Sequence, residues 1–104
     1  MENNVVSIGI PASKTITLDT PVQRGDTQLT ELTIRSPKKA GHLRGLNTLD
    51  IVQMNVDTLI RLLPRITDLS ELEVADMDPA DLLKAGVVVV GFLMGSQQEA
   101  YLTA

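Results

Sequence analysis

The spacing of apolar residues changes at Ser36-Pro37, and this change constrains the fold of the 104-residue chain more than any other feature. Before it, Leu32 and Ile34 alternate with polar residues, which is the pattern of a strand with one buried face. Serine is a favourable cap and proline fits the first helical turn, so a helix is predicted over residues 37–44. The chain is therefore expected to pass from strand to helix at this point.

A second alternating segment precedes this strand, and the two together predict an antiparallel hairpin. Ile16 and Leu18 alternate with polar residues within residues 15–22, and residues 27–35 form the following strand. Residues 23–26, Gln-Arg-Gly-Asp, lie between them and favour a turn. A two-stranded hairpin is only marginally stable by itself in water, so the rest of the chain must cover its apolar face.

Helix signals occupy most of the chain after this point. The helix that starts at Pro37 is expected to end at Gly45, because glycine tolerates a positive φ. Residues 47–54 fit either a short helix or an irregular link. Asn55 or Asp57 is expected to cap the next helix. Its broad apolar stripe consists of Leu59, Ile60, Leu62, Leu63 and Ile66.

The last two helices carry the clearest start signals. Ser70 and Glu73 have the spacing of a capping box, and Asp78-Pro79 combines a cap with a first-turn proline. Residues 87–90 alone favour a strand, but the cap and the length of the pattern favour a helix that runs almost to the end of the chain. The expected fold class is α+β, with an N-terminal antiparallel β-hairpin packed on a small C-terminal helical set.

Length and hydropathy indicate one soluble domain. A chain of 104 residues has the size of a single domain. Residues 1–13 show no sustained period and are expected to form a flexible N-terminal arm, which leaves residues 14–104 as a single α+β domain. The longest apolar stretch, residues 85–94, is far shorter than the roughly 20 residues that a membrane-spanning helix needs. A cytoplasmic protein without a membrane partner is therefore expected.

The composition excludes most kinds of catalytic and metal-binding site. The chain has no cysteine and one histidine, His42, so thiolate ligands, a cysteine nucleophile and most hydrolytic triads are excluded. Asp76, Asp78 and Asp81 lack the pattern of a calcium loop. Asp78 is better placed as a cap, and Asp81 near the positive end of a helix dipole. No catalytic, cofactor-binding or metal-binding residue is assigned, and the protein is not expected to be an enzyme.

One basic cluster leaves a nucleic-acid function open as an alternative. The whole chain has a formal net charge of -4, and only 2% of its residues are aromatic. Cationic side chains bind phosphate, but base stacking needs aromatic residues, and no helix-turn-helix pattern is evident. The alternative function is therefore a small regulator that binds nucleic acid through a basic cluster, which consists of Arg35, Lys38, Lys39, His42 and Arg44.

The final helix carries apolar residues on nearly every side between residues 82 and 94. One side is expected to form the core with the hairpin and the helix of residues 55–66. A domain this small is not expected to bury every side, so an exposed strip for another helix or a second subunit is predicted on the same element. Gly86, Gly91 and Gly95 are attributed to close helix packing. The residues assigned to partner binding are Leu82, Val88, Val89 and Phe92, with Val88 and Val89 as candidates for the most exposed face.

The order of these segments resembles a known family. The strand of residues 27–34 runs into Arg-Ser-Pro-Lys-Lys-Ala-Gly-His-Leu-Arg-Gly-Leu at 35–46. Leu-Ile-Arg-Leu-Leu-Pro-Arg-Ile-Thr follows at 59–67, and Asp-Pro-Ala-Asp-Leu at 78–82. Over residues 15–93 the chain resembles the tail assembly chaperones of Mu-like and P2-like contractile-tailed bacteriophages.

The resemblance implies a protein without catalytic residues that binds the phage tape measure protein and keeps it soluble during tail morphogenesis. Tape measure proteins are long, largely helical and prone to aggregate, so a chaperone with an apolar helical surface would shield them. The tail tube protein and a second copy of this chain are the other implied partners. The implied location is the bacterial host cytoplasm, and the alternative function becomes that of a small phage regulator.

Overall fold

The computed structural model describes residues 12–103, with side chains up to residue 95. Strands β1 (Ser13–Arg24) and β2 (Thr27–Arg35) form an N-terminal hairpin, and a short 3-10 turn follows at Ala40–Leu43. The helices are α1 (Thr48–Val52), α2 (Val56–Ile66), α3 (Glu71–Ala75) and α4 (Pro79–Thr103). The predicted α+β fold, a hairpin followed by a small set of helices, is confirmed.

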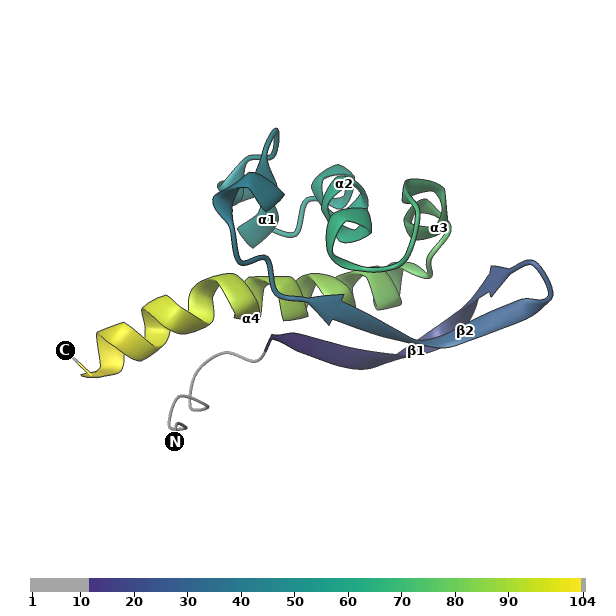
Figure 1. The fold of residues 1–104 in the computed structure, drawn as a ribbon, viewed down its shortest axis with the longest axis horizontal. Coiled ribbons are helices and arrows are strands. Elements are labelled where there is room, and N and C mark those ends of the chain that lie inside the picture. The colour runs from purple at the N-terminus through teal and green to yellow at the C-terminus, as the bar shows by residue number, and fades with distance from the viewer. Residues whose placement is uncertain (1–11, 104) are drawn as a thin grey trace.

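The long helix α4 is the axis around which the other elements are arranged (Figure 1). Helices α1, α2 and α3 stand side by side above it in this view, and the hairpin runs below them with β1 in contact with α4. The C-terminal part of α4 extends beyond the other helices at one end, and the hairpin turn extends beyond α3 at the other. Both strands and all four helices contribute buried side chains to a single core between these layers.

The hairpin follows the predicted alternation. Its strands are antiparallel, with Ile16 opposite Leu32. The turn consists of Gly25 and Asp26 alone, and Gly25 has a φ of +58°. Glycine adopts this angle without steric cost, as the first position of a tight hairpin turn requires. The side chains that face the core are Ile16, Leu18, Val22, Leu32 and Ile34.

A large bulge interrupts the ladder in the middle of β1. Thr17 pairs with Glu31, and Val22 pairs with Leu29. The four residues between Thr17 and Val22 therefore stand opposite the single residue between Leu29 and Glu31. Extra residues of this kind lose their partners in the ladder and bend the strand. The bulge thus frees backbone N–H groups of β1 for contacts with another element, and α4 uses two of them.

The prediction of a helix over residues 37–44 is wrong. The N–H of Ser36 donates a hydrogen bond of 2.8 Å to the carbonyl oxygen of Ala12, so Ser36 extends the pairing of the hairpin and does not cap a helix. The helical segment is reduced to the 3-10 turn, which begins after the extended residue Lys39. Gly45 follows with a φ of +81°, so the predicted glycine stop is confirmed after a much shorter turn.

The predicted caps of the later helices are confirmed. The side chain of Asn55 accepts the N–H of Thr58 at 3.0 Å at the start of α2. Ser70 and Glu73 form the capping box of α3, in which the Ser70 hydroxyl accepts the N–H of Glu73 at 3.1 Å. The ambiguous segment 47–54 contains a short helix, α1, whose cap is an asparagine side chain.

The start and the helical state of α4 also follow the sequence. Asp78 Oδ1 accepts the N–H of Ala80 at 2.8 Å, and Pro79 occupies the first helical position. Residues 87–90 are helical, so the cap and the length of the pattern outweigh the local β preference. The predicted stripe of α2 packs into the core beside α4, with Leu59, Leu62, Leu63 and Ile66 buried and Ile60 partly buried.

Candidate functional site

Helix α4 presents apolar side chains on two separate sides. The inner side is buried against the rest of the domain and consists of Leu82, Ala85, Val89 and Phe92. The other side, here called the outer seam, consists of Leu83, Val87, Val90 and Met94. Leu83 is 47% exposed, Val87 59% and Met94 40%, while Val90 is partly buried. Residues spaced by four, three and four positions lie on one side of a helix, so the outer seam is a continuous apolar strip.

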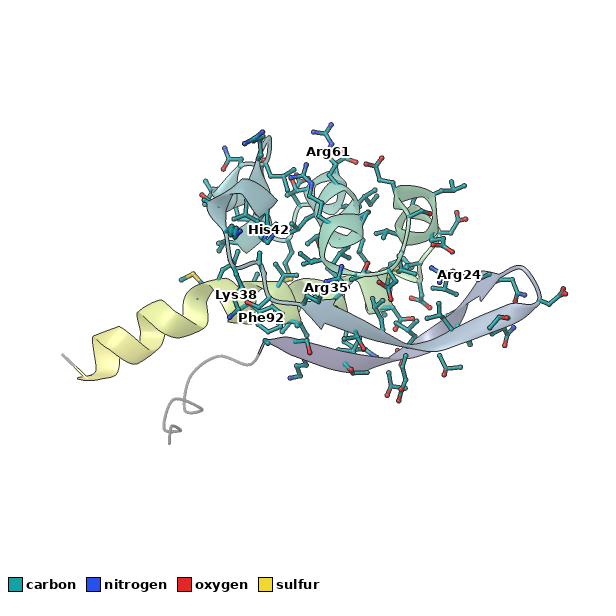
Figure 2. The ribbon with its side chains drawn as sticks, in the orientation of Figure 1. Arg24, Arg35, Lys38, His42, Arg61 and Phe92 are labelled. Carbon is teal, nitrogen blue, oxygen red and sulfur yellow. The ribbon has the colours of Figure 1, made fainter. Side chains whose placement is uncertain are left out.

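Three of the four residues assigned to partner binding lie in the core. Leu82, Val89 and Phe92 are buried, Val89 completely, and Val88 is partly buried. Figure 2 shows Phe92 where α4 passes the hairpin. The expectation that Val89 is a candidate for the most exposed face is therefore wrong. Sequence analysis missed the exposed residue Val87, although the spacing of apolar residues along the helix could have separated the two sides.

A pocket opens beside the N-terminal end of the outer seam. Its volume is about 270 Å³, and it lies between α2, α3 and the first turns of α4. Every lining residue is apolar, and they include Val56, Ile60, Ala75 and Leu82. Leu83 belongs both to this lining and to the outer seam. The pocket and the seam therefore form one connected apolar surface.

Two glycines of α4 have different surroundings. A Cβ added to Gly86 would lie 3.0 Å from Leu59 Cδ1 and 3.2 Å from Met54 Sδ, so this glycine allows close packing of α4 against its neighbours. A Cβ added to Gly91 would meet nothing within 4 Å. The attribution of glycine to close packing is confirmed for Gly86 and wrong for Gly91. Gly91 lies four residues after Val87 and adds an open position beside the outer seam.

A buried carboxylate fixes α4, and with it the outer seam, to the hairpin. Asp81 is 1% exposed. Its Oδ1 accepts the N–H of Asp19 at 2.8 Å and its Oδ2 accepts the N–H of Thr20 at 3.0 Å. Both N–H groups belong to the bulge of β1. Burial alone would raise the pKa of Asp81, but these two donors and the ammonium group of Lys84 at 3.6 Å outweigh it and lower the pKa.

Three further contacts strengthen this joint. Lys84 Nζ donates to the carbonyl oxygen of Thr17 at 2.8 Å and lies 3.1 Å from Oδ1 of Asp19. The hydrogen bond to Asp19 raises the pKa of Lys84, against the lowering effect of burial. The Thr20 hydroxyl donates to Oδ2 of Asp78 at 2.7 Å. The first turns of α4 are thus attached to the bulge by side chains from both elements, which orients the pocket end of the outer seam.

An ion pair attaches α3, one wall of the pocket, to the hairpin. Arg24 Nε lies 2.9 Å from Glu73 Oε2, and Arg24 Nη2 donates to Glu73 Oε1 at 3.0 Å and to the carbonyl oxygen of Asp68 at 2.9 Å. Figure 2 shows Arg24 beside the hairpin where it passes α3. The hydrogen bonds from Arg24 and then from the N–H of Ser70 lower the pKa of Glu73 to about 2.

Two contacts within the domain engage one member of the basic cluster, Arg35. Arg35 pairs with Asp68 at 3.4 Å and donates to the carbonyl oxygen of Thr67 at 3.2 Å. His42 accepts the N–H of Lys39 on Nδ1 at 3.4 Å, within the 3-10 turn. Figure 2 shows Arg35 at the end of β2, apart from His42. One member of the cluster is thereby committed to a contact within the domain.

Between residues 12 and 103, no group of three or more His, Asp or Glu side chains is arranged to hold a metal ion. Within the same part of the chain, no helix is long and apolar enough to cross a membrane.

Comparison with known proteins gives a family for the chain. Residues 15–94 match the profile of the family described as phage tail assembly chaperone proteins, E, or 41 or 14. The matched segment begins at the third residue of β1 and ends at Met94, the last residue of the outer seam. It therefore contains nearly all of the hairpin, the residues that line the pocket and the whole seam.

Two curated relatives come from Escherichia phage P2. The chain is 44% identical over 80 residues to tail assembly protein E, an alignment that covers 75% of this chain and 87% of the relative. It is 43% identical over 81 residues to tail assembly protein E′, covering 76% of this chain and 56% of the relative. The alignment thus spans little more than half of the longer relative. No solved structure matches the chain.

Proposed function

The chain belongs to the family of phage tail assembly chaperones, and we propose that it binds the tape measure protein and keeps it soluble during tail assembly. The observation that carries this proposal is the outer seam of α4. A large, solvated apolar strip on a small domain commonly marks an interaction surface. A long helical partner with apolar stripes of its own would bury the seam and be shielded in turn.

The size of the surface suits a partner that must later be released. Full burial of one Leu, Val or Met side chain contributes about 1.5–3 kcal/mol, and the seam residues are partly buried already. Association also costs several kcal/mol of translational and rotational freedom. A single contact of this kind is therefore expected to be reversible, and coverage of a long partner would require many copies of the chain.

The other parts of the proposal follow from the same role. Tape measure protein would be bound in the bacterial host cytoplasm before and during polymerisation of the tail tube, and the tail tube protein would replace the chaperone. Self-association of the chain is a further expectation. The alternative of a nucleic-acid-binding regulator has less support, because Arg35 already pairs with Asp68.

Co-expression tests the proposal. Tape measure protein of the same phage is produced with the wild-type chain, with a Val87→Asp/Met94→Asp variant, or alone. Of these three cultures, we expect soluble tape measure protein, in a complex on size exclusion, only in the one with the wild-type chain. Leu49→Asp is the matched control, because Leu49 is 60% exposed and belongs neither to the seam nor to the pocket. Equal soluble yields with and without the wild-type chain, and no complex, would reject the proposed function.

A further inference from the structure

The spacing of the outer seam restricts the shape of what can cover it. Leu83, Val87, Val90 and Met94 repeat with the alternation of four and three residues that is found where two helices pack along each other. An extended strand presents side chains with a period of two and cannot match this spacing over its length. The seam therefore fits an α-helix that lies along α4.

The pocket provides a different contact at one end of the seam. It is open, it is lined by apolar residues, and it has a volume of about 270 Å³. A helix that lies along the seam would pass the pocket at Leu83, which belongs to both. A bulky apolar side chain at that point of the helix could enter between Val56 on α2 and Ala75 on α3. Buried anchors of this kind dominate the binding energy of helix-in-groove complexes.

Charged residues around the pocket are mostly acidic. Asp76 is exposed between the lining residues Ala75 and Met77, and Glu71 is exposed one turn before Ala75 on the same side of α3. Within the described residues, neither of these two carboxylates takes part in an ion pair. The α3 side of the pocket therefore carries unneutralised negative charge.

The basic residues near the pocket do not cancel this charge. Arg24 is paired with Glu73, and Lys84 with Asp19. Arg61 follows the lining residue Ile60 but projects from the side of α2 that is farthest from α4 (Figure 2). A partner helix with Lys or Arg beside its apolar anchor would thus meet complementary charge.

We propose that the pocket takes one bulky apolar side chain of a partner helix that lies along the outer seam, and that this helix carries Lys or Arg next to the anchor. The inference rests on the proposed function, and it states which side chains the partner would bring to this surface. Helix α4 of a second copy fits the seam and the pocket less well than a basic helix. Its charged residues are Asp81, Lys84 and Glu99, and its one cation, Lys84, already pairs with Asp19.

Two synthetic helices test the charge preference. Each has about 28 residues, with leucine at the heptad positions that form an apolar seam. One carries lysine and the other glutamate at the same flanking positions. Binding to the intact chain is measured by fluorescence anisotropy at low and high salt. We expect the lysine helix to bind about tenfold more tightly at low salt, with a smaller difference at high salt because exposed charges are screened.

Variants of the chain locate the two contacts. Ala75→Trp fills the pocket from an exposed position and should weaken binding of the lysine helix about tenfold, whereas Ala40→Trp, exposed on the 3-10 turn, should not. Glu71→Lys/Asp76→Lys should abolish the preference for lysine. Asp26→Lys/Glu31→Lys makes the same change in net charge on the hairpin, far along the chain from the pocket, and should retain the preference.

Each outcome separates this inference from the proposed function. Equal binding of both helices, a preference that survives Glu71→Lys/Asp76→Lys, or full binding to Ala75→Trp would overturn the inference, as would the absence of binding to either helix. Co-expression with tape measure protein still reports on the proposed function in all these cases. A homodimer that is disrupted by Val87→Asp and by Ala75→Trp would assign the surface to a second copy and also overturn the inference.

Discussion

Asp81 on α4 accepts the backbone N–H of Asp19, in the bulge of β1, at 2.8 Å, and with Thr20 at 3.0 Å it satisfies two donors that the strand ladder leaves free. A buried N–H without an acceptor costs free energy comparable to a lost hydrogen bond, so the bulge and the carboxylate stabilise the fold only together. This joint sets the position of α4, and therefore the direction in which the outer seam faces.

We expect Asp81→Asn to destabilise the domain. The amide has one acceptor oxygen and would present a donor to one of the two N–H groups, which leaves that group unsatisfied. Hydrogen bonds to charged groups contribute about 1.5–3 kcal/mol to stability. We therefore expect the free energy of unfolding to fall by about 2 kcal/mol and Tm by roughly 10 °C. Thermal unfolding followed by circular dichroism measures this effect. Asp26→Asn, exposed in the hairpin turn, is the control, and equal Tm values for both variants would contradict the role assigned to Asp81.

The two sides of α4 should respond differently to an introduced aspartate. Val89 is completely buried, so Val89→Asp is expected to unfold the domain, whereas Val87→Asp, at a position 59% exposed, should leave the circular dichroism spectrum and Tm nearly unchanged. Both variants place the same side chain on the same helix two residues apart. Similar destabilisation by both would mean that the outer seam is part of the core.

Stability should fall in acid, partly because of Glu73. Its pKa is about 2 in the folded domain, against an ordinary value of 4.5, so the unfolded chain binds more protons between these limits. The stabilising contribution of Glu73 is complete above pH 4.5 and is lost as the pH falls towards 2. The lowered pKa of Asp81 acts in the same direction. Glu73→Gln should therefore show a smaller fall in Tm between pH 5 and 2 than the wild type, and parallel curves would refute this assignment.

A glycine substitution tests the open position in α4. Gly91→Ala should raise the free energy of unfolding by up to about 1 kcal/mol, because alanine favours the helix and the added methyl group meets nothing within 4 Å. Gly86→Ala gains the same helix propensity but must displace Leu59 and Met54, so its stability should be lower than that of Gly91→Ala. Urea denaturation compares the two. A Gly86→Ala variant as stable as Gly91→Ala would show that the packing around Gly86 is loose.

Much of the fold could be predicted from local signals. The alternation in β2 and the caps at Asn55, Ser70 and Asp78 each depend on residues within a few positions of one another, and the structure retains all of them. The cap expected at Ser36 failed because its N–H pairs with Ala12, 24 positions earlier (36 minus 12), and a local pattern carries no information about that partner.

The candidate site could be predicted only in part. An exposed apolar strip on the final helix followed from its composition, and the outer seam is such a strip. The choice of Val89 failed because the sequence alone does not say which side of a helix that is apolar nearly all round faces the core. The roles of Asp81 and of the pocket depend on the bulge and on the placement of α3, and both result from contacts between segments far apart in the sequence.

Site-specific crosslinking tests the central claim, that the outer seam contacts tape measure protein. The chain has no cysteine, so Val87→Cys provides a unique attachment point for a photoactivated crosslinker, and Thr17→Cys on the outer face of the hairpin provides the control. After co-expression with tape measure protein, labelling and illumination, mass spectrometry should identify tape measure peptides joined at position 87 and few or none at position 17. Adducts at position 17 with none at position 87 would contradict the account.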